Sequence, residues 1–263
     1  MKENRKKIEQ VTGVQLKEIK GKIDEAEKKK IKKKVDTIWK GLNSKKPAES
    51  KEVKITLQQG DSLAEIWSAI ASVYLVEFQE FEKAKKGFEN AIKLEPNHAD
   101  HWDSYGSFWL YNQENISEAE LAYKKACELE PSNSEYINNL GKLYLRYQHD
   151  YEKAFECFDK GLQLKPNDPE LLTNKGATFE EKGDLSQAEN YYLKAIEQAP
   201  EYTPALVKLA DLYHYELHQP DKALQHYLQV IIVEPNRFMT WLSLAHLYHF
   251  HLNEPEQAKK GHI

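Results

Sequence analysis

The sequence has few of the residues and motifs that support covalent or metal chemistry. Its 263 residues include only two cysteines, Cys127 and Cys157, which we expect to be reduced and at or near the core of an intracellular protein. It contains no glycine-rich phosphate loop, no Gly-x-Ser-x-Gly nucleophile motif and no His-Glu-x-x-His metal motif. The sequence therefore predicts no catalytic residue, no cofactor and no enzyme.

Histidine is the one metal-ligand type that recurs at helical spacing. His214 and His218 are four residues apart, and His246 and His249 are three apart; such spacing can place two side chains on one helix face, where they can hold a metal. No cysteine lies near them in the sequence, and Asp211 is the only carboxylate at a suitable spacing. We therefore expect no metal site.

Long apolar runs and a secretory signal are also missing. No stretch of about 18 apolar residues occurs, so no membrane span is expected. The first residues, Met1 to Lys7, are mostly polar and lack the apolar segment of a secretory signal. The predicted location is cytoplasmic, with the nucleus as an alternative because Lys28–Lys34 is a strongly basic run.

Proline, by contrast, recurs at nearly constant intervals. The spacings between successive members of the series are 35, 35, 34 and 35 residues. Proline cannot continue a helix, and the polar residues that follow, such as Asn133, Asp168 and Thr203, are suited to capping the next one. The period therefore predicts a repeated helical unit. The series is Pro96, Pro131, Pro166, Pro200 and Pro235.

A second pattern is in phase with the prolines. A large apolar residue follows each proline by six positions, a very small residue comes four positions later, and an aromatic residue three beyond that. A further segment has alanine followed four residues later by an aromatic. Small residues let two helices approach closely, and the spacing is that of amphipathic helices. The small residues of the first segment are Ala71, Gly106, Gly141, Gly176, Ala210 and Ala245.

This pattern resembles the tetratricopeptide repeat family, whose units carry Trp-x2-Leu-Gly-x2-Tyr, then Ala-x3-Phe, then Pro. The resemblance covers about three quarters of the chain: five full repeats over about 64–236 and a partial sixth over 237–263. It implies an all-α fold, an α-solenoid of antiparallel helix pairs, in which each unit packs on its neighbours.

The repeats are not identical. Repeat four has the family length, with Gly183 and Asp184 in its inner turn, whereas the other full repeats have one extra residue, which we expect in that turn. Repeat six stops at Ile263, part-way into its second helix. Because a terminal repeat normally needs a polar cap, we expect either a truncated chain or a partner on that end.

Charge divides the chain in two. Residues 1–60 hold 18 Lys and Arg against 9 Asp and Glu, a net charge of +9, whereas residues 61–263 hold 19 against 33, a net charge of −14. We therefore predict a basic N-terminal arm and linker over 1–60, helical or partly disordered, and the solenoid over 61–263. Two apolar stripes mark helices in the arm: Leu16, Ile19, Ile23 and Ala26, then Ile31, Val35, Ile38 and Leu42.

Three interpretations of the Lys28–Lys34 run remain open. It is a solvated helix face or disordered arm, it docks onto the acidic solenoid, or it binds nucleic acid or a membrane surface. The arm has one aromatic residue, Trp39, which gives no series of rings for base stacking.

By the resemblance, the first helix of each repeat lines a concave groove that binds peptides or partner helices. Asparagine can grip a peptide backbone through its donor and acceptor atoms, and Lys and Arg bind carboxylates. The predicted ligand is therefore an acidic or C-terminal peptide segment. The candidate groove residues are Tyr111 of repeat two, Asn138, Asn139, Lys142 and Arg146 of repeat three, Asn174 of repeat four and Lys208 of repeat five.

Some family members hold chaperone tails through a carboxylate clamp, and this chain matches that clamp only in part. The Asn and Lys of the first helix, here Asn138 and Lys142, are exchanged in order, Asn174 fits, and the third helix has Pro204 in place of one of two cations. Solvated polar residues with no ligand, or a different polypeptide ligand, remain the alternatives.

These patterns predict a non-enzymatic scaffold or adaptor that binds a peptide or helix of a partner protein in the groove. One alternative is a structural subunit of a larger assembly, held through the open C-terminal repeat, through which it can also oligomerise, and the basic arm. Another is an RNA-associated scaffold, since the arm is the one part suited to nucleic acid.

Overall fold

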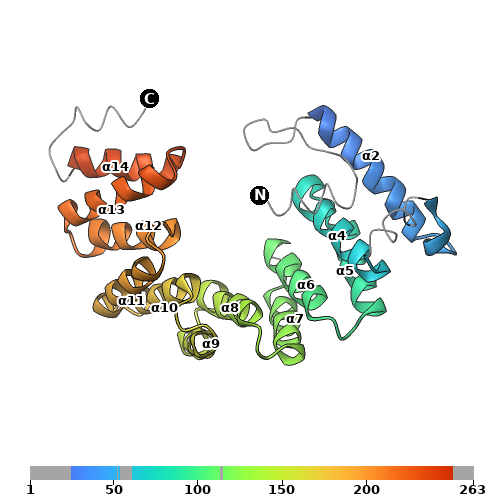
Figure 1. The fold of residues 1–263 in the computed structure, drawn as a ribbon, viewed down its shortest axis with the longest axis horizontal. Helices are drawn as coiled ribbons and strands as arrows, with labels where there is room; N and C mark the ends of the chain where they lie inside the picture. The colour runs from blue at the N-terminus through green and yellow to red at the C-terminus, as the bar shows by residue number, and fades with distance from the viewer. Residues whose placement is uncertain (1–24, 52, 54–60, 113–114, 251–263) are drawn as a thin grey trace. The chain divides into compact units, whose positions relative to one another are not determined.

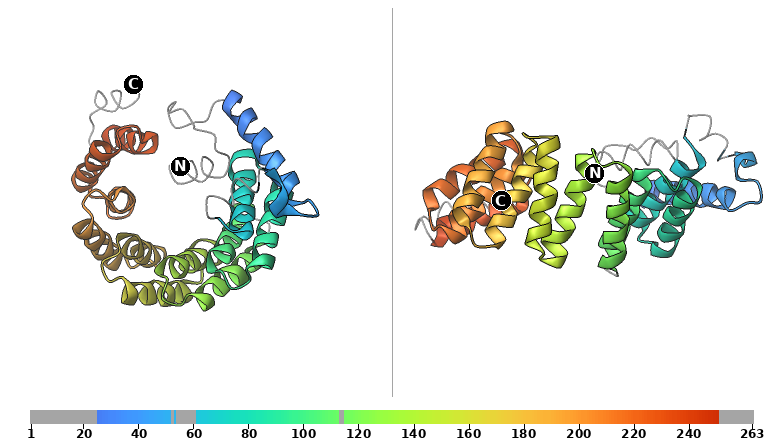
Figure 2. Two further views of the ribbon diagram at one scale, coloured as in Figure 1. Left: turned by 45° about the vertical axis from the view of Figure 1, so that its right-hand side comes forward. Right: turned by 90° about the horizontal axis from the view of Figure 1, so that it is seen from below.

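In the computed structural model, residues 25–51, 53, 61–112 and 115–250 are described. Throughout these residues the regular structure is helical, and the chain divides into two compact units, Met1–Pro131 and Ser132–Ile263. Within each unit, successive helices pack as antiparallel pairs (Figures 1 and 2). Each unit therefore has the arrangement of an α-solenoid, as predicted.

In the described residues of the first unit, one helix precedes two helix pairs. The pairs α4/α5 and α6/α7 correspond to repeats one and two, and α5 also packs on α6. The elements are α2 (Glu25–Leu42), the 3₁₀ turn η1 (Pro47–Glu49), α4 (Leu63–Val73), the π-helical turn η2 (Tyr74–Phe78), α5 (Phe81–Leu94), α6 (Ala99–Asn112) and α7 (Ile116–Leu129).

Up to residue 250, the second unit contains three helix pairs and the first helix of the sixth repeat. Each pair packs on the next along the chain. The elements are α8 (Ser134–Leu143), η3 (Tyr144–Gln148), α9 (Tyr151–Leu164), α10 (Pro169–Glu181), α11 (Leu185–Gln198), α12 (Thr203–Asp211), η4 (Leu212–Glu216), α13 (Pro220–Val233) and α14 (Phe238–Phe250).

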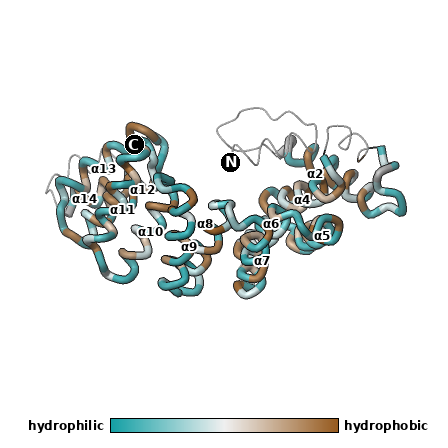
Figure 3. Tube along the Cα trace, turned by 60° about the horizontal axis from the view of Figure 1, so that its bottom comes forward, coloured by the Kyte–Doolittle hydropathy of each residue, from teal (hydrophilic) through white to brown (hydrophobic). Residues whose placement is uncertain are grey.

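The small residues of the repeat lie where the two helices of a pair touch. A Cβ atom added to Gly141 would lie 2.6 Å from the ring of Phe158, and one added to Gly176 would lie 2.7 Å from the ring of Tyr192. Both aromatic residues are fully buried. The predicted pairing of a small residue with an aromatic residue is confirmed, and the hydropathy-coloured trace alternates along the helices as amphipathic packing requires (Figure 3).

The prolines also take part in fixing the next helix. The indole N–H of Trp102 donates to the carbonyl of Pro96 at 2.8 Å, and that of Trp241 donates to Pro235 at 2.8 Å. Asp168 caps α10 as predicted. Thr203 does not cap α12, because it is the first residue of that helix, and its hydroxyl instead donates to Glu234 at 2.6 Å.

The extra residue of the longer repeats is not simply added to the inner turn. In repeats one, three and five the first helix ends in a π-helical turn, η2, η3 or η4, whose wider spacing takes in the additional residue. Gln79 and His149 directly follow η2 and η3 in the left-handed conformation, and His218 does so after one residue that follows the end of η4, with φ of 52–54°. Repeat four, which lacks the extra residue, reverses at Gly183, with φ of 81°.

Helix α2 packs against the first repeat. Its apolar stripe, Ile31, Val35, Ile38 and Leu42, is buried as the spacing predicted. Polar contacts add to this packing: the hydroxyl of Tyr74 donates to Asp36 at 2.7 Å, Lys83 lies 3.2 Å from Asp36, and Lys32 pairs with Glu80. Within the basic run, Lys32 contacts the first repeat, whereas Lys29, Lys30 and Lys33 are exposed. The helix is therefore docked, while most of its lysines form a solvated face. The stripe from Leu16 lies outside the described residues, apart from the helical backbone at Ala26.

Candidate binding site in the second unit

Two buried asparagines form the centre of the predicted patch. Asn138 lies on α8 and Asn174 lies on α10, with 6% and 5% of their surfaces exposed. The Nδ2 group of Asn174 donates to Oδ1 of Asn138 at 2.8 Å. This bond uses one lone pair of the Asn138 oxygen and fixes the orientation of the Asn138 amide, whose nitrogen remains available as a donor.

A carboxylate of the chain itself accepts from this asparagine. Oε1 of Glu170, in the first turn of α10, accepts from Nδ2 of Asn138 at 2.8 Å and from Nζ of Lys142 at 3.0 Å. The buried Asn138 and the half-buried Lys142 thus donate to the same oxygen atom. The site accordingly holds a carboxylate by two donors, one of them charged.

The pKa of Glu170 reflects both the burial and these donors. Partial burial by itself raises the pKa of the carboxyl, but Lys142, Asn138 and the nearby charge of Arg146 outweigh it and hold the pKa below its ordinary value. Glu170 is therefore ionised at neutral pH. Its side chain is still 48% exposed, so it can leave the site without unpacking the core.

The donors line a pocket of about 200 Å³ between α8 and α10. Asn139 is on its wall, half-buried, whereas Arg146 is exposed on η3, beyond the end of α8. The pocket is lined by Ser134, Glu135, Asn138, Asn139, Lys142, Asp168, Glu170 and Leu171.

Two predicted residues lie outside this group. Lys208, on α12, pairs with Glu180 at 3.3 Å and does not contact Glu170. Tyr111 lies near the end of α6 in the first unit, and its side chain is outside the described residues. The structure thus joins Asn138 to Asn174 by a hydrogen bond and Asn138 to Lys142 through the shared carboxylate of Glu170, and it places Asn139 and Arg146 nearby.

Asp211, His214 and His246, considered above as metal ligands, are instead linked to Tyr227 and to each other. The hydroxyl of Tyr227 donates to Asp211 at 2.6 Å, and Nδ1 of His214 lies 3.2 Å from that hydroxyl. Nε2 of His214 lies 3.2 Å from Nδ1 of His246. His218 was predicted on the same helix as His214. The helix instead ends at Glu216, and His218 lies in the turn that follows, in the left-handed conformation.

Among the residues that the structure describes, no group of three or more His, Cys, Asp or Glu is placed to hold a metal ion. None of the helices there is both long and apolar enough to cross a bilayer.

Family models described as tetratricopeptide repeat match four segments of the chain. One model matches residues 122–156 and 191–225, and another matches 64–98 and 169–202. Helix pairs with this sequence pattern and this packing define an α-solenoid of repeats. The chain is a tetratricopeptide repeat protein. Such proteins are typically non-enzymatic scaffolds for protein–protein interaction.

Solved structures show the same fold. PilW, a type IV pilus biogenesis factor, is 21% identical with a TM-score of 0.66 over 76% of this chain and 91% of its own. The pilF protein of Pseudomonas aeruginosa is 20% identical with a TM-score of 0.62 over 75% and 88%. A tetratricopeptide repeat protein of Thermus thermophilus is 17% identical with a TM-score of 0.60 over 71% and 100%. A search of curated protein sequences found no match to the chain.

At these identities the similarity concerns the fold. The specific partner, the predicted oligomer, the nucleic-acid alternative and the cytoplasmic or nuclear location stay predictions, as does the boundary at residue 60. The candidate site must therefore be argued from its own geometry.

Proposed function

We propose that the protein is a non-enzymatic scaffold whose second unit binds a partner polypeptide through a carboxylate, either an acidic side chain or a free C-terminus. The observation that carries this proposal is the arrangement around Glu170. Asn138 and Lys142 donate to one carboxylate oxygen at 2.8 and 3.0 Å, and Asn174 fixes the orientation of Asn138.

The intramolecular carboxylate supports a ligand of the same chemistry. Donors that are buried and held by a second hydrogen bond are already oriented, so little further ordering is needed when a ligand binds. Glu170 is half-exposed and its ion pair with Lys142 is also partly exposed; such pairs contribute at most about 1 kcal/mol. A ligand carboxylate that makes further contacts along the pocket can therefore displace it.

The flanking residues support a peptide over a free small anion. Asn139 lies on the pocket wall, and its amide can pair with a peptide backbone. Arg146 is exposed near the carboxylate and adds positive charge where the chain of a ligand would continue. A bound peptide can contact Asn139 and Arg146 as well as the donors Asn138 and Lys142, whereas an isolated anion can contact only the two donors.

Binding to peptide pools tests this proposal. The probes are a pool of random short peptides with free C-terminal carboxylates and the same pool amidated. We expect wild-type protein to retain the free-carboxylate pool in preference, and Lys142→Glu with Arg146→Glu to abolish that preference. Lys160→Glu, an exposed charge reversal on α9, is the control and should leave it unchanged.

Removing the competing carboxylate gives the opposite change. Glu170→Gln keeps the size of the side chain and removes its charge, so we expect affinity for the free carboxylates to rise by about fivefold. Glu181→Gln, an exposed position on the same helix, is the matched control. Equal retention of both pools, or loss of affinity in Glu170→Gln, contradicts the proposed site.

A further inference from the structure

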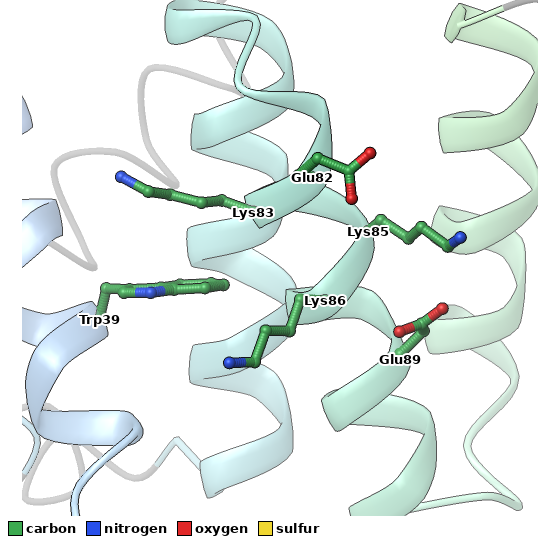
Figure 4. Close-up of a pocket in the computed structure, with 6 residues that line it drawn as sticks. All are labelled: Trp39, Glu82, Lys83, Lys85, Lys86 and Glu89. Atoms are coloured by element: carbon green, nitrogen blue, oxygen red, sulfur yellow. The ribbon is translucent and has the colours of Figure 1, made fainter.

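A second surface with binding character lies in the first unit, where α2 meets α5. An open depression of about 410 Å³ there is lined by Trp39 of α2 and by five charged residues of α5 (Figure 4). Ligand sites commonly have volumes of this order and combine an aromatic wall with a few polar groups. The predicted groove does not include this surface, because it is formed with a helix outside the repeats.

Trp39 is held in place as the wall of this depression. Its ring packs edge-on against Trp67 at 5.0 Å and Tyr74 at 5.2 Å between centroids, and it is only half-buried. Asp36, one turn earlier, accepts from Tyr74 and pairs with Lys83. The indole therefore keeps its position without a ligand, and part of its surface stays open to solvent.

The lysines around the indole differ in what they contact. Lys83 pairs with Asp36 and with Glu80, at 3.2 and 2.7 Å. Lys86 lies over the Trp39 ring at 5.9 Å, is exposed, and forms no ion pair among the described residues. Figure 4 shows Lys83 and Lys86 on the side of Trp39, whereas Glu82, Lys85 and Glu89 point away from it.

Helix α2 continues this positive charge. Lys29, Lys33 and Lys40 are exposed, and spacings of four and seven residues put them on one side of the helix. Lys40 follows Trp39 directly. Lysines of α5 line the depression beside Trp39, and further lysines lie on the helix that carries Trp39, in a chain whose residues 61–263 are strongly acidic.

We propose that this surface, formed by Trp39, Lys86, Lys33 and Lys40, binds an acidic peptide segment that places one apolar side chain against the indole. The apolar side chain covers the exposed part of Trp39, and flanking carboxylates pair with Lys86 and with the lysines of α2. The site is separate from the carboxylate pocket of the second unit and needs no residue of it.

Charge and aromatic content favour a peptide over a nucleic acid. Glu82 and Glu89 line the other side of the depression, and a phosphate backbone, charged at every step, would meet them. Binding of single strands also relies on successive aromatic rings on which bases stack, whereas Trp39 is the only ring in this lining. A peptide can place its charges only where the lysines are.

The test uses the full chain and an acetylated, amidated peptide with one leucine flanked on both sides by glutamates. Without terminal charges, this probe separates the surface from a C-terminal carboxylate site. We expect it to bind with an affinity that falls as salt is raised, and we expect replacement of its leucine by serine to weaken binding several-fold. Only the peptide changes in that comparison, so a change in protein folding cannot explain the result.

Lys86→Glu should weaken binding of the peptide by roughly tenfold, since attraction is replaced by repulsion at an exposed site. Lys93→Glu, an exposed reversal further along α5, should change it less than about twofold, and Lys142→Glu in the second unit should not change it. Equal losses in Lys86→Glu and Lys93→Glu, equal binding of the serine peptide, or tighter binding of oligouridylate would overturn the proposal.

Discussion

Single residues determine how closely the helices of a pair approach. Gly106, Gly141 and Gly176 occupy the same position of successive repeats, and each leaves room for an aromatic ring of the second helix. The sequence predicted this arrangement because a small residue and an aromatic residue recur in phase. To predict this contact it is enough to know the register of the repeats, which the proline positions give.

Gly141→Val should destabilise the second unit by about 2 kcal/mol, because the added side chain meets the ring of Phe158 in a filled core. Urea unfolding measures the change. Valine has a higher helix propensity than glycine, so propensity alone would favour Gly141→Val. Glu156→Val, at an exposed position of α9, is the control for placing valine on a helix surface and should cost less than about 0.7 kcal/mol. A loss in Gly141→Val no larger than in this control contradicts the packing described.

The binding residues were predictable only in part at this scale. Asn138, Lys142 and Asn174 were found from polar residues at equivalent repeat positions, and the structure brings them together. The role of Glu170 was not predictable, because it follows the cap Asp168 and has the sequence character of an ordinary first-turn acidic residue. Its contacts with Asn138 and Lys142, 32 and 28 residues earlier, depend on side-chain conformation.

At the scale of elements, the ends of the first helices differ from the sequence-based prediction in the same way in three repeats. The extra residue of repeats one, three and five lies in a π-helical turn, so the helices extend further than a simple loop insertion implies. Local propensity does not distinguish the two arrangements, since both contain the same residues. The π turns begin at Tyr74, Tyr144 and Leu212, which are all buried. This burial depends on the packing of the two helices, which the local sequence does not specify.

Helix α2 shows the same limit. Its apolar stripe was predicted, but the surface that buries the stripe was not, because the sequence left three interpretations of its lysines open. The deciding contacts are specific: Asp36 with Tyr74 and Lys83, and Lys32 with Glu80. Partial burial raises the pKa of Asp36 and of Glu80, but these hydrogen bonds and ion pairs outweigh it and hold both pKa values below the ordinary 3.8 and 4.5.

Docking of α2 should therefore weaken in acid. A carboxyl with a lowered folded-state pKa stabilises the fold above its unfolded pKa, and that contribution is lost as the pH falls through the folded value. We expect amide hydrogen exchange in α2 to accelerate relative to α4 below about pH 4. Asp36→Asn should reduce this pH dependence; an α2 protected equally at pH 7 and pH 3 contradicts the role given to the carboxylates.

At the scale of the molecule, the fold was the most predictable property. The proline period and the phase of small and aromatic residues specify helix pairs, their order and their register, and these are physical consequences of repetition. Function was less predictable, because the same framework carries different surface residues in each repeat. The two proposed sites differ accordingly: one needs buried asparagines of repeats three and four, and the other needs a helix that precedes the repeats.

The central claim is that Asn138 donates to the carboxylate of a bound peptide in place of Glu170. Nuclear magnetic resonance of the Asn138 side-chain amide tests it most directly, using one peptide selected from the free-carboxylate pool and its amidated form. We predict that the free-carboxylate peptide shifts the Asn138 amide signals and that the amidated peptide does not. Binding of the free-carboxylate peptide with the Asn138 signals unchanged would contradict the account.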